Sequence, residues 1–144
     1  MAEDHRAGTV LHASCVLVGS RGVLILGASG AGKSTLALAL MGMGATLVAD
    51  DRTRLWREGA ALMAEAPAAI RGRIEARGIG LLAAEAAGPA ALGLVVDLDG
   101  REEARLPPMR QIALLGATLP LVLGPLRPGQ APGIRQMALA GRLA

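Results

Sequence analysis

Apolar residues fall into short runs along the chain, and these runs predict the elements of the fold. Residues 10–18 and 23–26 are rich in β-branched and aliphatic side chains, and turn-forming residues separate them, which predicts two strands joined as a hairpin. Residues 34–43 hold strong helix formers, and Gly44 stands where a glycine commonly ends a helix. Residues 46–49 then predict a third strand.

The rest of the chain continues as apolar runs separated by turn residues. Further strands are predicted at residues 52–56, 60–65, 92–97 and 119–123. A short helix or loop is predicted at 67–73, a charged, proline-containing loop at 99–110, and a terminal helix from Ile134 onward. Because no repeat or linker interrupts this order, we expect one α/β domain over residues 1–144, with a mixed β-sheet and flanking helices.

Composition narrows the class of protein. The 144 residues are 52% hydrophobic and 19% charged, which argues against disorder, and no stretch reaches the roughly 18 uninterrupted apolar residues of a membrane span. The N-terminal residues lack the apolar core of a signal peptide, so we expect a cytoplasmic protein without a membrane partner. The net charge of +3 comes from scattered arginines, and a single Trp is no stacking platform, which disfavours a nucleic-acid partner.

Cysteine and lysine each occur once in the chain. Cys15 cannot form an intrachain disulfide, and its place in an apolar run predicts a buried strand residue rather than a reactive thiol. Lys33, the sole lysine, lies in the glycine-rich segment between the second predicted strand and the first predicted helix. This segment is therefore the first candidate for a functional site.

The glycine-rich segment has the phosphate-loop pattern G-x-x-x-x-G-K-[S/T]. A strand, a glycine-rich loop and a helix are the context that this pattern needs, because loop amides and the helix N-terminus together bind phosphate. Lys33 would supply charge to the β- and γ-phosphates, and the Ser34 hydroxyl suits Mg²⁺. We therefore predict binding of ATP with Mg²⁺. The residues expected to hold the nucleotide are Gly27, Ala28, Ser29, Gly30, Ala31, Gly32, Lys33, Ser34 and Thr35.

Acidic residues follow the third predicted strand. Parallel strands present their carboxyl ends to the same crevice, so Asp50 and Asp51 are placed to bind Mg²⁺ or to deprotonate an acceptor. Adjacent side chains on an extended segment point to opposite sides, so we expect only one of the two to face the phosphates. His12 could belong to the site, but an isolated strand histidine commonly has only a structural or surface role. Glu75 and Arg77 lie beside a glycine-rich turn, where an acid and a base commonly form only a local ion pair.

Four motifs, in their order and spacing, resemble the catalytic domain of the bacterial HPr kinase/phosphorylase family. That domain carries a His on a strand ahead of a G-x-S-G-x-G-K-S loop, followed by A-D-D-R and then E-x-R-G-x-G. The matching segments here are residues 11–12, 27–34, 49–52 and 75–80. The resemblance covers residues 9–130. It implies a phosphate-loop kinase that transfers phosphate from ATP to a serine of the phosphocarrier protein HPr, with the reverse dephosphorylation as a second activity.

The resemblance also implies roles for individual residues. Asp50 would be the acid–base residue, which accepts the serine proton during phosphorylation. Lys33 and His12 would hold phosphate groups during catalysis, and Arg105 would be the family's later active-site arginine. Ser34 and Glu75 would bind Mg²⁺, and Asp51 is a further candidate ligand.

Family precedent implies a ring-like, hexamer-like homo-oligomer, and pyrophosphate or phosphate as further small partners. Longer members have an additional N-terminal domain, whereas His12 lies almost at the start of this chain, so we expect a catalytic core without that domain. Gln130 stands where the family has an Arg, in a segment associated with dephosphorylation. The sequence therefore supports the kinase reaction more strongly than its reverse.

Two other functions are compatible with a phosphate loop. A regulatory module would bind nucleotide and change its affinity for a partner without transferring phosphate. A small-molecule phosphate-loop kinase is the other alternative, although the chain has no arginine-rich lid segment, and the adjacent Asp50 and Asp51 are not typical of that group. Phosphate found on a partner's serine would separate the protein kinase from both alternatives.

Overall fold

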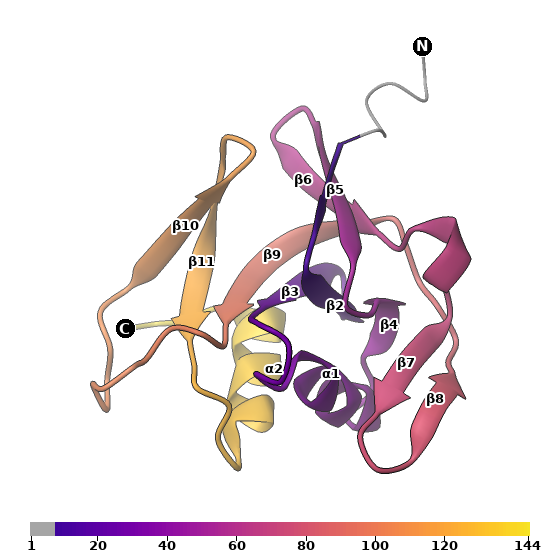
Figure 1. The fold of residues 1–144 in the computed structure, drawn as a ribbon. Helices are drawn as coiled ribbons and strands as arrows, with labels where there is room; N and C mark the ends of the chain where they lie inside the picture. The colour runs from indigo at the N-terminus through magenta and orange to yellow at the C-terminus, as the bar shows by residue number, and fades with distance from the viewer. Residues whose placement is uncertain (1–7) are drawn as a thin grey trace.

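The computed structural model describes residues 8–144, in which two helices lie against a mixed β-sheet (Figure 1). The strands are β1 (Thr9–Leu11), β2 (Ala13–Val18), β3 (Arg21–Leu26), β4 (Thr46–Ala49), β5 (Thr53–Glu58), β6 (Ala61–Glu65), β7 (Arg73–Ala76), β8 (Gly80–Ala83), β9 (Ala90–Asp97), β10 (Arg110–Leu114) and β11 (Ala117–Leu123). The helices are α1 (Lys33–Gly42), α2 (Gln130–Ala140) and the 3₁₀ turn η1 (Ala68–Ile70). The predicted fold class is confirmed.

Two expectations concern the chain ends and membranes. Residues 1–7, on which the expectation about a signal peptide rests, lie outside the described residues. Within residues 8–144, no helix is long and apolar enough to cross a membrane.

The sheet is built around β9. Its strands pair in the order β1-β5-β6-β9-β3-β2-β4, and the β10–β11 hairpin joins through β11. β9 has two neighbours along one edge, because residues 90–91 pair with β6 and residues 95–97 pair with β11, while β3 lies along its other edge. β7 and β8 form a separate two-stranded sheet.

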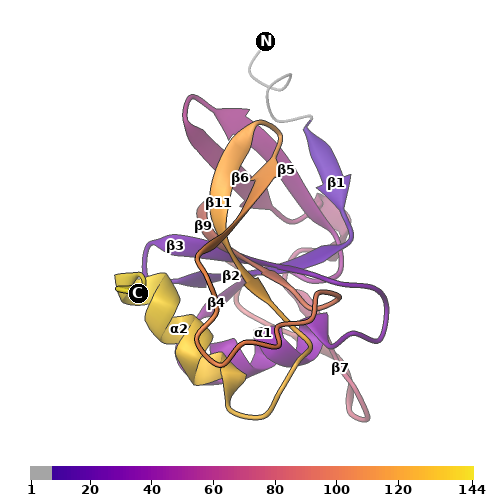
Figure 2. The same cartoon turned by 90° about the vertical axis from the view of Figure 1, so that its left-hand side faces the viewer.

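Layers of structure cover both faces of the central strands. α1 and α2 lie on one face, whereas the β5–β6 and β10–β11 hairpins rise on the other (Figures 1 and 2). Along β3, Val23 and Ile25 pack into the helix-side core with Leu36 of α1, and Leu24 packs into the core beneath the hairpins. Since both faces are buried, the central strands are continuous apolar runs rather than alternating ones.

The predicted strand over residues 10–18 is divided in the structure. Leu11 pairs with Thr53 of β5, whereas Ala13 pairs with Leu26 of β3. His12 lies in the bend between these two pairings and is exposed. The expectation that His12 lies on a strand is therefore wrong, because the chain changes pairing partner at this residue.

The helices begin and end close to their predicted positions. α1 agrees with the prediction within one residue at each end, and Gly44 adopts the left-handed φ of 103° while its N–H donates to the Met41 carbonyl at 3.0 Å. α2 begins at Gln130, four residues before the predicted start at Ile134. Pro132 fits inside the first turn of α2, because its missing N–H would have no helical partner there. β7, β8 and β10 were not predicted.

Candidate active site

The topology brings two loops to the same edge of the sheet. β2 is antiparallel to both β3 and β4, so β3 and β4 run in the same direction on either side of it. The phosphate loop follows β3, and Asp50 and Asp51 follow β4. The predicted meeting of loop and carboxylates at one edge is confirmed, although an antiparallel strand lies between the two parallel ones.

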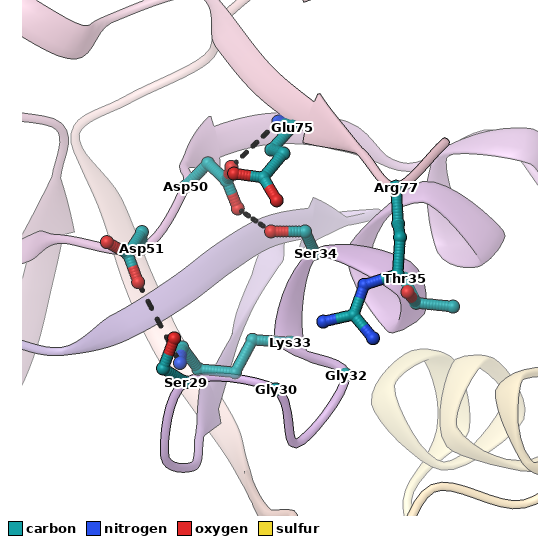
Figure 3. A pocket seen from close by; sticks show the side chains of 10 residues that line it. All are labelled: Ser29, Gly30, Gly32, Lys33, Ser34, Thr35, Asp50, Asp51, Glu75 and Arg77. Atoms are coloured by element: carbon teal, nitrogen blue, oxygen red, sulfur yellow. Dashed lines mark hydrogen bonds and ion pairs between the residues drawn. The ribbon is translucent and has the colours of Figure 1, made fainter. Parts of the chain in front are cut away.

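A pocket opens at this edge, where the phosphate loop meets the end of β4 and the turn of the β7–β8 hairpin (Figure 3). The residues that line it are Ser29, Gly30, Gly32, Lys33, Ser34, Thr35, Asp50, Asp51, Glu75 and Arg77. Three of these side chains are carboxylates and two are cations. A nucleotide phosphate would add negative charge to an already acidic pocket, which favours binding together with a divalent cation.

Gly32 shapes the start of α1. It is the N-cap residue, in a left-handed conformation with a φ of 104°, and its carbonyl accepts the Leu36 N–H at 2.9 Å. A Cβ atom at this position would lie 2.6 Å from Cδ2 of Leu126, in the segment before α2. The backbone conformation therefore favours glycine, and a larger residue would also displace the end of the Leu126 side chain. The first-turn amides of α1 have no partner within the helix, and residues 33–35 of this turn line the pocket.

Lys33 is turned back onto its own loop. Its side chain is only 6% exposed, and its ammonium donates to the carbonyl oxygens of Gly27 at 2.7 Å and of Ala28 at 3.3 Å. The same ammonium lies 3.8 Å from Oδ1 of Asp51. Phosphate bound in the loop would compete with these carbonyls for the Lys33 donors.

The Asp50 carboxylate accepts hydrogen bonds from three different elements, and Figure 3 shows those from Ser34 and Glu75. Ser34 of α1 donates to Oδ1 at 2.6 Å, and Ser14 of β2 donates to the same oxygen at 2.9 Å. The backbone N–H of Glu75 on β7 donates to Oδ2 at 3.0 Å. Ile74 beside it is 1% exposed in the helix-side core, which anchors β7 against the site. Asp50 is thus a fixed, nearly buried carboxylate at the inner wall of the pocket.

Asp51 differs from its neighbour in both exposure and backbone. Its side chain is 58% exposed, and its φ of 67° lies in the left-handed region. Both carboxylates line the pocket, so the expectation that strand alternation would turn one of them away does not hold. The reason is the left-handed backbone at Asp51, which ends the extended conformation on which alternation depends.

Three residues near the pocket were not among the predicted site residues. Ser14 bonds Asp50, and Asp99 accepts the Ala28 N–H of the phosphate loop at 2.9 Å. Arg77 lines the pocket and forms no ion pair with Glu75 among the described residues. A serine within an apolar strand is a signal for Ser14, whereas the sequence holds no signal for the approach of Asp99.

Two predicted site residues are not in the pocket. His12 is exposed in its bend, and only the adjacent backbone reaches the site, where the Ala13 N–H donates to the Asp51 carbonyl at 3.1 Å. Arg105 is exposed in the loop between β9 and β10. The structure therefore brings together the phosphate loop, both aspartates and Glu75, and leaves His12 and Arg105 outside.

Displaced pKa values occur away from the pocket. Arg110 donates to both carboxylate oxygens of Glu102, at 2.7 and 3.0 Å, and this lowers the pKa of Glu102 to about 2. The same contact raises the pKa of Arg110. Burial raises the pKa of Cys15 to about 12, and this residue is fully buried in β2, as predicted.

Comparisons with known proteins place the chain among HPr kinases by sequence. The family described as the HPr Serine kinase C-terminal domain matches residues 4–90. The HPr kinase/phosphorylase of Caldicellulosiruptor bescii is 39% identical over 132 residues, which cover 83% of this chain and 42% of that protein. The HPr kinase/phosphorylase of an Exiguobacterium species is 32% identical over 135 residues, which cover 85% of this chain and 43% of that protein.

A solved structure shows the same fold. The structure of the Hpr(Ser) kinase/phosphatase from Coxiella burnetii superposes with a TM-score of 0.77 and 29% sequence identity, over 90% of this chain and 87% of that chain. This chain spans less than half the length of the two curated relatives described above. The sequence match and the shared fold lead to one conclusion: the chain belongs to the HPr Serine kinase C-terminal domain family.

Proposed function

We propose that this chain is an ATP-dependent protein kinase that phosphorylates a serine of the phosphocarrier protein HPr. The observation that carries the proposal is the 2.6 Å hydrogen bond between Ser34 of the phosphate loop and Asp50, in the pocket that Lys33 also lines. Phosphoryl transfer needs a phosphate cradle and a carboxylate that positions the acceptor, and this contact joins the two. The curated relatives described above are named HPr kinase/phosphorylase, which supports this reaction.

The oxygen groups of the pocket fit Mg²⁺. Within residues 8–144, no three or more His, Cys, Asp or Glu side chains gather as a ready-made metal site. Mg²⁺ that accompanies a nucleotide commonly takes one or two carboxylates and completes its shell with phosphate oxygens and water. We propose Ser34, Glu75 and Asp51 as the groups that hold it. When bound, it would neutralise charge on the β- and γ-phosphates.

The two oxygens of Asp50 suit different tasks in the proposed transfer. Oδ1 accepts two hydroxyl donors, which fix the direction of the carboxylate, while Oδ2 accepts a single described hydrogen bond, from Glu75. Oδ2 therefore has the capacity to take the proton of the acceptor serine. As that serine oxygen bonds to the γ-phosphorus, the bond to the β–γ bridging oxygen breaks and ADP leaves. Lys33 and the loop amides would stabilise the charge on the transferred phosphoryl group.

The experiment that tests this proposal is phosphopeptide mass spectrometry of the cognate HPr after incubation with the purified chain, ATP and Mg²⁺. The proposal expects one phosphate on a serine of HPr. An HPr variant with that serine replaced by alanine, and Lys33→Ala in the kinase, are the matched controls, and neither reaction should yield phosphoserine. If HPr stays unmodified while a known HPr kinase modifies it in parallel, the proposal is wrong.

The same assay distinguishes the regulatory alternative. A nucleotide-sensing module would bind ATP and alter its affinity for a partner, yet leave HPr unmodified. ATP binding measured by calorimetry, together with absence of phosphoserine, would favour that module over the kinase.

We propose phosphorylation rather than its reverse as the main direction. Gln130 stands where the family has an Arg, and its side-chain oxygen accepts the Arg127 N–H at 3.3 Å. Incubating serine-phosphorylated HPr with phosphate and measuring the pyrophosphate formed would test the reverse direction.

A cytoplasmic location would follow from HPr as the partner. A ring-like homo-oligomer, implied by the family resemblance, is testable by light scattering.

A further inference from the structure

Ser14 is a fully buried polar side chain near the active site that the proposed reaction does not yet use. It lies near the start of β2, the strand between β3 and β4, and it is 0% exposed. Its strand neighbours Ala13 and Cys15 belong to the core beneath the hairpins. A serine in such an apolar strand costs free energy unless its hydroxyl is satisfied.

The Ser14 hydroxyl is satisfied by both active-site acids. It donates to Oδ1 of Asp50 at 2.9 Å and accepts the backbone N–H of Asp51 at 3.0 Å. These partners lie 36 and 37 residues further along the chain. A buried serine hydroxyl more commonly bonds to a backbone group close in sequence. Here both hydrogen bonds of the Ser14 hydroxyl, one donated and one accepted, go to the residues that follow β4.

Each bond constrains a different feature of the site. The bond to Asp50 reaches the same oxygen that accepts from Ser34 at 2.6 Å, so Ser14 and Ser34 hold the carboxylate from two sides. The bond from the Asp51 N–H helps to hold the left-handed backbone at that residue, where φ is 67°. Non-glycine residues adopt this conformation at a cost, and surrounding contacts must stabilise it.

Thr53 shows what a buried hydroxyl does when it is purely structural. It is also 0% exposed, and it lies on β5, three residues after Asp50. Its hydroxyl donates to the Ala13 carbonyl at 2.8 Å and so ties β5 to the start of β2. Thr53 and Ser14 are therefore matched in burial and location, but only the Ser14 hydroxyl bonds the acids.

We propose that Ser14 is a positioning residue, which orients the Asp50 carboxylate toward Ser34 and fixes the backbone of Asp51 for binding of Mg²⁺ with the nucleotide. This inference rests on the proposed nucleotide site, and it goes further by assigning a role to a residue outside the pocket. Ser14 is not among the residues that line the pocket. Its loss would leave the phosphate loop and Lys33 in place, so the defect should appear only when binding depends on the cation.

The test compares Ser14→Ala with Thr53→Val in binding of a non-hydrolysable ATP analogue, measured by calorimetry with Mg²⁺ and with EDTA. Ser14→Ala should bind the analogue about tenfold more weakly in Mg²⁺, because the N–H of Asp51, a proposed Mg²⁺ ligand, loses its acceptor, and within about twofold of wild type in EDTA. Thr53→Val should match wild type within about twofold in both conditions. Thermal unfolding of both variants measures the general cost of losing a buried hydroxyl.

Several outcomes would overturn the inference. These are an unchanged Mg²⁺-dependent affinity in Ser14→Ala, an equal loss in Thr53→Val, and a wild-type chain that binds no analogue in either condition. If Ser14→Ala does not fold, Ser14→Cys keeps the volume with a weaker donor and should show the same cation-dependent loss, whereas Ser14→Thr should restore affinity. A Ser14 effect on binding without any HPr phosphorylation would disprove the proposed kinase function alone.

Discussion

Two carboxylates in this chain are each held by several donors, one inside the pocket and one at the base of a loop. Asp50 accepts from Ser14, Ser34 and the Glu75 N–H. Glu102, in the loop between β9 and β10, accepts from Nε and Nη2 of Arg110. The two sites look alike as hydrogen-bonded carboxylates, but their surroundings differ.

The partners of each carboxylate decide its role. Asp50 binds groups from β2, α1 and β7, so it joins three elements at a pocket wall. Glu102 joins its loop to β10, and its backbone carbonyl accepts from Arg127 at 2.6 Å, which ties the loop to the segment before α2. Glu102 has a strongly lowered pKa and yet lies outside the pocket. The lowered pKa of Glu102 reflects its ion pair with Arg110, and its location outside the pocket marks it as a structural anchor rather than a functional group.

The largest expected effect comes from Asp50→Asn. We expect HPr phosphorylation to fall about 10³-fold, because the amide cannot accept the serine proton, while affinity for nucleotide stays within about threefold. Glu102→Gln makes the same chemical change at the other carboxylate and should keep the rate within about twofold. Steady-state kinetics and calorimetry on both variants measure this contrast. A similar loss of rate in the two variants would remove the distinction between them.

Gly32→Ala should have the next largest effect. The added Cβ would sit in a left-handed backbone, 2.6 Å from Cδ2 of Leu126, so the phosphate loop is strained and either the loop or the Leu126 side chain must shift. We expect nucleotide affinity to fall about tenfold to hundredfold, measured by calorimetry. Gly59→Ala is the matched control, because Gly59 also has a positive φ, of 59°, but has open space around its Cβ position. An equal loss of affinity in Gly59→Ala would show that strain alone, away from the pocket, explains the result.

Glu102→Gln should lower stability in a pH-dependent way. The pKa of Glu102 is lowered from 4.5 to about 2 in the folded protein, so its ion pair stabilises the fold fully above pH 4.5. That contribution is lost as pH falls from 4.5 toward 2. Urea unfolding at pH 7, 5 and 3 measures the free energy of unfolding, and the values for wild type and Glu102→Gln should converge as the pH falls to 3.

The control for this prediction is Glu103→Gln, at the exposed neighbouring position in the same loop. The free energy of unfolding of Glu103→Gln should differ little from that of wild type, and this difference should change little over the same pH range. A gap between wild type and Glu102→Gln that widens on acidification would contradict the assigned ion pair.

The smallest effect concerns Cys15, whose pKa is displaced by burial without a charged partner. Its pKa of about 12 and its full burial leave almost no thiolate near pH 8, so alkylation should be slow in the native protein and fast in urea. Mass spectrometry after timed exposure to iodoacetamide measures both rates. Native labelling as fast as labelling in urea would show that β2 opens readily, and would weaken the fixed placement of Ser14 beside it.

Much of the site was predictable because it is local in sequence. The phosphate loop, the helix after it and Gly44 at its end follow from residue type and spacing, since their geometry is set by neighbouring φ angles and turn-by-turn hydrogen bonds. Asp50 and Asp51 were predicted at the end of a strand, and β4 ends there. The left-handed backbone of Asp51 was not predicted, because it depends on contacts with Ser14 and Ala13 of another strand.

The remaining differences come from contacts between distant segments. His12 could not be placed from sequence, because the change of pairing partner at that residue depends on β5, which follows about forty residues later. Arg105 lies in a loop whose path depends on Glu102, Arg110 and Arg127, and the structure leaves its side chain exposed. β10 escaped prediction because a short, half-buried strand is defined by its partner β11 more than by its own residues.

The sequence by itself determined the phosphate loop, the α/β class and the resemblance to a kinase family, because these depend on short-range geometry and on the order of a few motifs. Only the tertiary structure decided how the residues around the phosphate loop are arranged. It placed Ser34 against Asp50, drew Arg77 and Glu75 to the pocket, and linked Ser14 to both acids. The physical reason is that these contacts join β2, α1 and β7 to the end of β4. Hydrogen bonds between separate elements form only once the elements have packed.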